Sequence, residues 1–256
     1  MLEFFQDPKV AEQVQYLLHN VPYAIWETIY STVLATFFAY IIGLPLGIIL
    51  VTGEKGGIRP LPSPLMKLLN IIINILRSVP FLILMVVVFP LARVIVGTSI
   101  GTKASIVPLT IAAFPFVARL VEASLREMDG GVIEAAQAMG CSTFQVIWKV
   151  ILPESLPSLL TSFTTAFVTI LGYGAMAGAI GAGGLGSMAL NRGYTRHMMV
   201  VLYVSVIFLV ILVQVFQSLG GHFAAALDRR NRSPKSLTRA ARAHADKNRR
   251  SGDPTL

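Results

Sequence analysis

Residues 134–153 read EAAQAMGCSTFQVIWKVILP, and their pattern predicts two short helices joined by a tight turn. Small side chains at Ala135, Ala136 and Ala138 give the first helix a slim face that another protein surface can approach closely. Gly140 can adopt a positive φ and end that helix. We therefore expect a docking element. The alternative is an ordinary amphipathic connector between two longer helices.

The second helix of this stretch has its own start signal. Ser142 and Gln145 have the spacing of a capping box, in which each side chain binds the backbone N–H of the other residue. Phe144, Ile147 and Trp148 give this helix an apolar side. These features favour the docking element over the connector.

Composition places the chain among membrane proteins. Hydrophobic residues make up 54% of its 256 residues, charged residues make up 13%, and the mean hydropathy is +0.69, far from the balance of a soluble domain. A bilayer-spanning helix needs about 20 largely apolar residues. Five stretches qualify: 25–51, 68–96, 106–118 (with ends that extend into 102–124), 156–177 and 200–223. We expect an all-α membrane protein with five transmembrane helices.

Four prolines lie within these stretches and predict kinks, because neighbouring groups must satisfy the backbone that a proline frees. They are Pro80 and Pro90 in the second stretch, and Pro108 and Pro115 in the third.

The placement of Lys and Arg predicts the orientation. With the amino terminus outside, the inner segments hold fifteen of the 21 cations, nine of them after residue 227. The outer segments then hold Lys9, Arg93, Lys103, Arg192 and Arg196. Because cytoplasmic segments carry the excess of Lys and Arg, we predict an outside amino terminus and a cytoplasmic carboxyl terminus.

The two ends differ from the apolar middle, residues 23–227. Residues 1–22 lack the pattern of a signal peptide and predict an amphipathic helix in the outer interface or against another subunit; the alternative is a solvent-exposed segment that frays. Its apolar face would comprise Val10, Val14, Leu17, Leu18 and Val21.

Residues 228–256 carry nine cations and three acids, which favours disorder. Their position after the last span favours anionic lipid over nucleic acid; the alternative is a solvated tail that only fixes topology.

The chain shows no motif for using ATP or an ion gradient. It contains no G-x-x-x-x-G-K-[ST] phosphate loop. The apolar centres of all but the second stretch lack ionisable residues, whereas ion-coupled carriers bury carboxylates or histidines. Arg77 in the second stretch is the intramembrane charge, and it either faces a substrate, holds the helices together or extends back toward the cytoplasm. We therefore expect no enzymatic activity and no cofactor. Because Cys141 is the chain's one cysteine, an internal disulfide is ruled out.

A glycine-rich run, GYGAMAGAIGAGGLG, follows at 172–186. Its G-x-G-x-x-G spacing does not predict dinucleotide binding, because no strand precedes it and no αβ unit follows. We expect instead a flexible or tightly packed end to the fourth span. Tyr173 and Met176 are its bulky groups nearest the outer mouth, and a soft thioether suits a plug that must reopen; simple packing is the alternative. His197 and the two methionines after it are adjacent in sequence and cannot converge on one metal ion, so no metal site is expected.

The 134–153 stretch resembles the E-A-A, three residues, G, nine residues, I-x-L-P motif of ATP-binding-cassette (ABC) importer permeases. The match holds at Glu134, Ala135, Ala136, Gly140, Leu152 and Pro153, with Val150 in place of Ile. In that family the segment is a cytoplasmic helix–turn–helix that docks on a partner ATPase. The resemblance therefore implies that these six residues couple the chain to ATP hydrolysis by a separate subunit.

Longer runs resemble the methionine-uptake branch of these permeases, over about residues 22–227. They are RSVPF at 77–81, VIVGTSIG at 94–101, IVPLTIAAFPFVARLVE at 106–122 and the run at 172–186. This resemblance implies a type I ABC importer permease fold in a bacterial inner membrane, with residues 129–153 as the coupling loop. The implied assembly is a homodimer with two copies of the ATPase and a substrate-binding lipoprotein or periplasmic binding protein.

The resemblance implies L- and D-methionine as cargo, which composition and spacing do not show. Three alternatives stay open. The first is an importer for another small amino acid or a methionine derivative, the second is a non-transport membrane scaffold, and the third, disfavoured above, is an ion-coupled carrier.

Overall fold

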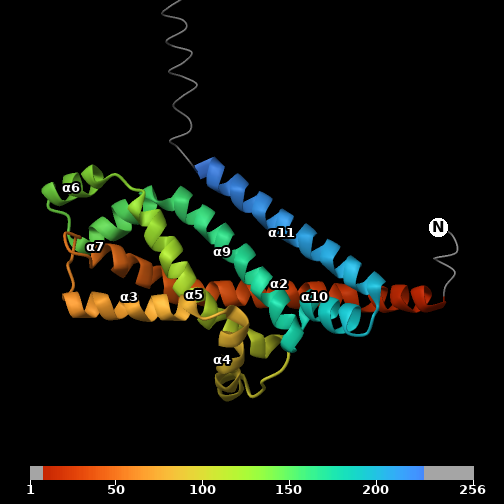
Figure 1. Cartoon of the computed structure of the whole chain (residues 1–256). Helices are drawn as coiled ribbons and strands as arrows, with labels where there is room; N and C mark the ends of the chain where they lie inside the picture. The colour runs from red at the N-terminus through yellow and green to blue at the C-terminus, as the bar shows by residue number, and fades with distance from the viewer. Residues whose placement is uncertain (1–7, 228–256) are drawn as a thin grey trace, which may run out of the picture.

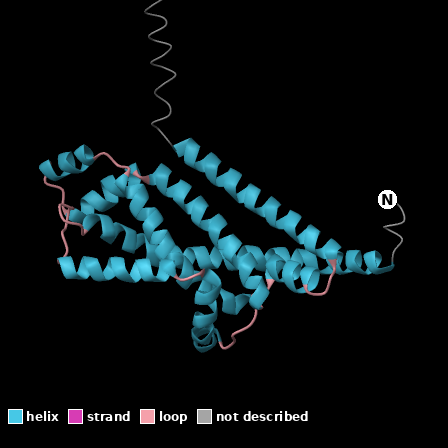
Figure 2. Ribbon diagram, in the orientation of Figure 1, coloured by secondary structure: helices cyan, strands magenta, loops and turns pink. Residues whose placement is uncertain are grey.

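The computed structural model describes residues 8–227, and this part of the chain is helical with no strand (Figures 1 and 2). The expected all-helical class is thus confirmed. The tail predicted for 228–256 lies outside the described residues. The elements in order are α2 (Pro8–Thr52), α3 (Ser63–Ser78), α4 (Phe81–Val96), α5 (Thr102–Arg126), α6 (Gly130–Ala138), α7 (Thr143–Val146), the π-helical η1 (Ile147–Ile151), α8 (Leu152–Glu154), α9 (Leu156–Ala177), the 3₁₀ turn η2 (Gly178–Ile180), α10 (Gly184–Ser187), the π-helical η3 (Met188–Tyr194) and α11 (Met199–Leu227).

Helix α2 is much longer than the span expected at 25–51. Its 45 residues extend about 68 Å at 1.5 Å per residue, more than twice the ~30 Å hydrocarbon thickness of a bilayer. The helix continues through Pro22, so no break separates the amphipathic segment from the first span. The domain boundary at residue 22 stays a prediction.

The predicted apolar face of residues 1–22 is only partly buried. Val10, Leu17 and Val21 are buried, whereas Val14 and Leu18 are 38% and 77% exposed. Leu17 and Val21 pack against the chain's own α10, η3 and α11. Part of the face that we assigned to an interface or another subunit therefore lies within the fold.

The second predicted span, 68–96, forms two helices, α3 and α4, which meet at an angle of 107°. The break falls at Val79 and Pro80. Val79 is extended (φ −75°, ψ 127°) because the ring of a following proline disfavours helical geometry. The kink predicted at Pro80 is thus a full break. Pro90, Pro108 and Pro115 lie inside helices that continue past them.

Within residues 8–227, four helices are long and apolar enough to cross a membrane: residues 10–52, 102–126, 156–180 and 199–227. Taken together as one unit, the bent pair formed by α3 and α4 is also long and apolar enough to cross a membrane. The expected count of five is therefore reached if that pair crosses as one span.

Close packing of α2 on α5 forms the centre of the molecule. Gly43 and Gly47, four residues apart, lie against Val117 and Val121 of α5. A Cβ on Gly43 would lie 2.7 Å from Val117 Cγ1, and one on Gly47 would lie 2.6 Å from Val121 Cγ1. Small residues at this spacing allow two membrane helices to approach closely. The surrounding core of α2, α5 and α9 includes Ala35, Ala39, Leu109, Ala113, Ala166 and Ile170.

The glycine-rich run turns the chain back onto α9. A Cβ on Gly178 would overlap the backbone of Gly186 and Ser187, and a Cβ on Gly186 would overlap the backbone of Ala175. Only glycine fits both positions. Of the two alternatives for this run, the tightly packed end is the one observed.

Candidate functional site

The 134–153 stretch folds as the predicted helix, turn and helix at one end of the molecule (Figure 1). Asp129 caps α6 by accepting a 2.9 Å hydrogen bond from the Gly131 N–H. Gly140 has φ +80°, as predicted for a residue that ends the first helix. The capping box is also confirmed: Gln145 Oε1 accepts from the Ser142 N–H at 2.9 Å, and Ser142 Oγ accepts from the Gln145 N–H at 3.4 Å.

The six motif residues divide between two faces. Glu134, Ala135, Gly140 and Pro153 are exposed, whereas Leu152 is partly buried and Ala136 is 3% exposed. Ala136 belongs to the core, together with buried Val146 and Ile151 of the second helix. The expected slim face is therefore not a single outer surface, because Ala136 points inward while Ala135 and Ala138 point outward.

Four large apolar side chains are exposed on the loop 129–153, which contains this stretch: Val132 (40%), Met139 (77%), Phe144 (68%) and Trp148 (58%). The Phe144 and Trp148 rings contact each other, with centroids 5.9 Å apart. Exposed aromatic residues of this size are typical anchors of protein interfaces. We name these four residues the apolar docking patch. The sequence indicated Phe144 and Trp148 as an apolar side, but gave no sign that Ile147 between them is partly buried.

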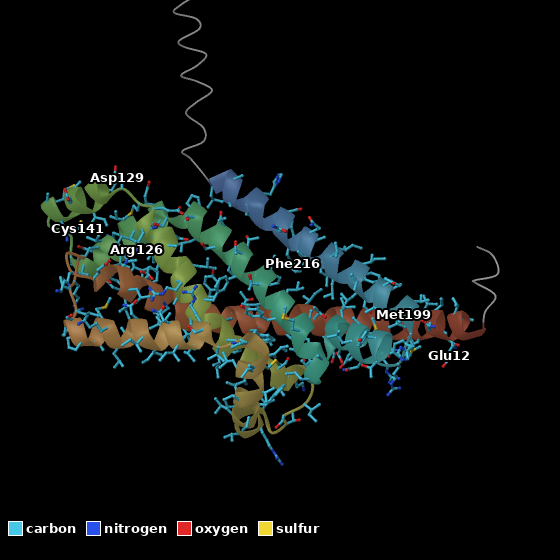
Figure 3. The ribbon with its side chains drawn as sticks, viewed as in Figure 1. Glu12, Arg126, Asp129, Cys141, Met199 and Phe216 are labelled. Atoms are coloured by element: carbon cyan, nitrogen blue, oxygen red, sulfur yellow. The ribbon has the colours of Figure 1, made fainter. Side chains whose placement is uncertain are left out.

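The base of this segment is held by hydrogen bonds between α5 and α9. Ser158 Oγ donates to Glu127 Oε2 at 2.6 Å, and the hydroxyls of Ser124 and Ser162 are 2.7 Å apart. The predicted coupling loop, residues 129–153, thus leaves α5 and enters α9 at points that these hydrogen bonds fix relative to each other. Figure 3 shows Asp129, Cys141 and Arg126 at this end of the molecule, and Glu12 and Met199 at the other.

Near the same end, a network of ion pairs and hydrogen bonds that sequence reasoning missed joins the loop after α2 to α3 and α5. Arg119 donates to Glu122 (2.6 Å), Asn70 (2.7 Å) and Asn74 (3.1 Å). Arg126 binds both Glu122 (2.9 Å) and Glu54, the latter at 2.7 Å. The sequence offered one indication of this network, the spacing of its polar residues: residues 119, 122 and 126 share one face of a helix, as do residues 70 and 74. The sequence could not predict that these two faces contact each other.

Tyr173, one of the two predicted gate residues, stacks on a residue that the sequence analysis did not single out. Its ring is parallel to Phe81, with an interplanar angle of 8° and centroids 4.3 Å apart. Met176, one turn further along α9, is 52% exposed. The structure therefore places Tyr173 against the start of α4 and leaves Met176 on the surface of this chain.

Arg77 lies exposed in the last turn of α3, four residues before Phe81. Within residues 8–227 it has no ion pair or side-chain hydrogen bond. The interpretation that Arg77 holds this chain's own helices together therefore finds no contact to support it.

A carboxylate that the sequence analysis passed over, Glu27 of α2, anchors the glycine-rich run. Its Oε1 accepts from Thr102 Oγ1 at 2.7 Å and its Oε2 accepts from the Gly184 N–H at 2.9 Å. The adjacent Thr28 Oγ1 accepts from the Leu185 N–H at 2.9 Å. One turn of α2 thus fixes the start of α5 and the start of α10. Among the described residues, no cluster of His, Cys, Asp or Glu has the arrangement of a metal site.

A family model described as "Binding-protein-dependent transport system inner membrane component" matches residues 43–233 of the chain. The chain belongs to this family.

Individual relatives of the chain have narrower descriptions than the family model. The probable D-methionine transport system permease protein MetI of Vibrio cholerae serotype O1 is 47% identical over 207 residues, which cover 81% of this chain and 92% of that protein. The protein of the same description from Pasteurella multocida is 45% identical over 204 residues, with 80% and 94% covered. A solved structure described as "Inward facing conformations of the MetNI methionine ABC transporter: CY5 native crystal form" has a TM-score of 0.81 and 43% identity, and covers 83% of this chain and 98% of that one. The resemblance to methionine-uptake permeases is confirmed.

Family membership and the apolar helices make the chain a multi-pass protein of a bacterial inner membrane. The matched residues include the coupling segment, the ion-pair network from Glu54 onward, and both predicted gate residues. Glu27 and residues 8–42 of α2 lie before the matched range.

Proposed function

We propose that the chain is the transmembrane permease subunit of an ATP-driven ABC importer for L- and D-methionine. The observation that carries this proposal is the 47% identity to a D-methionine permease along 92% of that relative's length. ATP hydrolysis is assigned to a separate ATPase subunit, and this chain contributes binding surfaces and a path.

The coupling site consists of Glu134, Ala135, Ala136, Gly140, Leu152 and Pro153, with the apolar docking patch as its contact surface. The capped helices and the Glu127–Ser158 hydrogen bond support this assignment. They make the segment a rigid unit that can pass a movement of the partner ATPase on to α5 and α9. Ala136 and Leu152 position the segment from within, since they pack against the core.

The path lies on the axis of a homodimer. Five spans in one chain leave little room for a sealed path, whereas a twofold pair shares one on its axis. Tyr173, supported by Phe81, and the exposed Met176 form the outer gate, and two ATPases open and close it as a rigid-body transition. Arg77, exposed and close in sequence to Phe81, is the charge that we place on the path.

In the membrane, the bent pair of α3 and α4 counts as one span and the amino terminus is outside. The proposed divisions are an amphipathic segment 1–22, a permease domain 23–227 and a basic tail 228–256. The docking segment then faces the cytoplasm, and the binding protein delivers cargo at the opposite end.

Reconstitution tests this function directly. The permease, its ATPase and its binding protein in vesicles should take up labelled L- and D-methionine only when ATP is inside with the ATPase. Competition by other small amino acids measures the specificity. Uptake that is independent of ATP would point to an ion-coupled carrier, and ATP-dependent uptake of a different amino acid with no methionine uptake would refute the cargo.

A further inference from the structure

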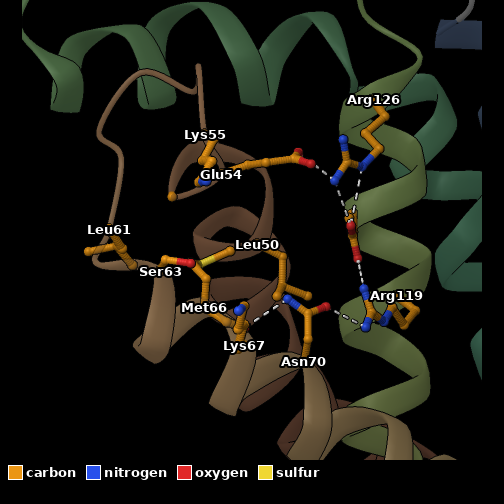
Figure 4. Close-up of a pocket in the computed structure, with 12 residues that line it drawn as sticks. Leu50, Glu54, Lys55, Leu61, Ser63, Met66, Lys67, Asn70, Arg119 and Arg126 are labelled. Atoms are coloured by element: carbon orange, nitrogen blue, oxygen red, sulfur yellow. Dashed lines mark hydrogen bonds and ion pairs between the residues drawn. The ribbon is translucent and has the colours of Figure 1, made fainter.

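A pocket of about 450 Å³ lies between the end of α2, the start of α3 and the last turns of α5 (Figure 4). Four cationic and two acidic side chains line it, which leaves a formal charge of +2. They are Lys55, Lys67, Arg119, Arg126, Glu54 and Glu122. Buried Leu50 and the partly buried Met66 contribute an apolar wall.

The two carboxylates are already neutralised by the arginines. Glu122 binds both Arg119 and Arg126, and Glu54 binds Arg126. Within the described residues, Lys55 and Lys67 have neither an ion pair nor a side-chain hydrogen bond. The net charge of the pocket therefore resides on two exposed lysines, which are free to bind an anion.

The surface of α3 that follows Lys67 toward Ser78 is apolar and exposed. Lys67, Ile71 and Ile75 follow one another at four-residue spacing and form one row on α3. Ile71 is 54% exposed and Ile75 is 59% exposed. The row extends about 12 Å from Lys67 to Ile75, close to the ~15 Å depth of one leaflet's hydrocarbon. A cationic pocket that heads an exposed apolar row matches a molecule with a charged head and a long acyl tail.

We propose that this pocket binds the phosphate headgroup of an anionic phospholipid of the inner leaflet, with Lys55 and Lys67 as the headgroup ligands and the Ile71–Ile75 row against an acyl chain. Basic pockets between transmembrane helices on the cytoplasmic side recognise such headgroups. The proposal rests on the orientation proposed above, in which an outside amino terminus places the loop after α2, residues 53–62, in the cytoplasm. A bound lipid here would bridge α2, α3 and α5 at the end where the docking segment lies.

Native mass spectrometry of the purified full-length chain, mixed with phosphatidylglycerol or phosphatidylcholine, tests this. The wild type should retain phosphatidylglycerol preferentially, and the double variant Lys55→Gln/Lys67→Gln should bind it roughly thirtyfold more weakly, from about 1 kcal/mol per cation. Arg59→Gln is the matched control, since Arg59 is exposed in the same loop but does not line the pocket. Lys55→Arg/Lys67→Arg should keep the binding. The tail is present in every variant and contributes equally.

Two outcomes would overturn the proposal. Equal phosphatidylglycerol retention by the wild type and the double Gln variant would show that the lysines do not bind lipid. Displacement of the lipid by excess inorganic phosphate would identify a site for a soluble anion instead. Labelling of an Arg59→Cys variant from either side, in a Cys141→Ser background, measures the orientation separately. Uptake assays report the transport function. A failure of the orientation or of transport is therefore distinguishable from a failure of lipid binding.

Discussion

At the scale of single residues, the contact between α2 and α5 depends on the absence of two side chains. A Cβ on Gly47 would lie 2.8 Å from the Ala118 carbonyl oxygen as well as 2.6 Å from Val121 Cγ1. The carbonyl belongs to the backbone and cannot rotate away. Because membrane helices associate mainly through van der Waals packing, even one methyl group at this position pushes them apart.

We expect Gly47→Ala to destabilise the permease by about 1–3 kcal/mol, the usual cost of overpacking. Thermal unfolding of the detergent-purified chain, followed by tryptophan fluorescence, measures the loss. Gly221→Ala in α11 is the matched control: nothing lies within 4 Å of its added Cβ, and alanine gains up to about 1 kcal/mol of helix propensity. Equal melting temperatures for Gly47→Ala and the wild type would contradict the close α2–α5 contact.

Residues whose role is local were predictable from the sequence, and residues whose partners are distant were not. Gly140 and the Ser142–Gln145 box act within a few positions, so their spacing was enough. Glu27 binds the Gly184 N–H, 157 positions away. A carboxylate near the start of an apolar stretch gives no local sign of such a partner.

At the scale of elements, the helices were predictable because apolar length and composition set them, but their bends and continuations were not. The break before Pro80 follows from its missing N–H and its ring, but its angle, 107°, could not be predicted because it depends on where α3 and α4 pack against α5. The unbroken passage of α2 through Pro22 is likewise a tertiary effect, because Leu17 and Val21 are held by α10, η3 and α11. The inward position of Ala136 arises from packing in the same way.

The coupling segment yields a prediction at this scale. Trp148→Ala should weaken the binding of the ATPase by roughly thirtyfold, the effect of losing an interface anchor worth about 2 kcal/mol, while leaving the melting temperature unchanged because Trp148 is 58% exposed. Co-purification of the tagged permease with its ATPase measures binding. Tyr194→Ala removes an aromatic side chain of similar exposure (66%) outside the coupling segment and should have no effect. Undiminished co-purification of Trp148→Ala would exclude the apolar docking patch as the ATPase contact.

At the scale of the whole molecule, the proposed importer needs a second copy of the chain to complete its path. Within residues 8–227, Met176 is 52% exposed, whereas the Tyr173 ring stacks on Phe81. A twofold axis near Met176 would bring two copies of this thioether together. The Glu27 contacts and the Gly178–Gly186 packing hold this end of α9 in place, so an outer gate there would move with the helix as a rigid unit.

A single cysteine at position 176 tests the dimer and the gate together. In a Cys141→Ser background, which removes the chain's own cysteine, Met176→Cys should form a disulfide between two permease chains under mild oxidation. The yield should differ between nucleotide-free and ATP-bound complexes, because closure of the ATPases moves the two halves relative to each other. Phe37→Cys, also exposed (57%) but on α2, serves as the control and should give little cross-linked dimer. A Met176→Cys chain that stays monomeric on non-reducing gels in every nucleotide state, while the complex still transports, would place the gate elsewhere and leave Met176 as a lipid-facing or packing residue.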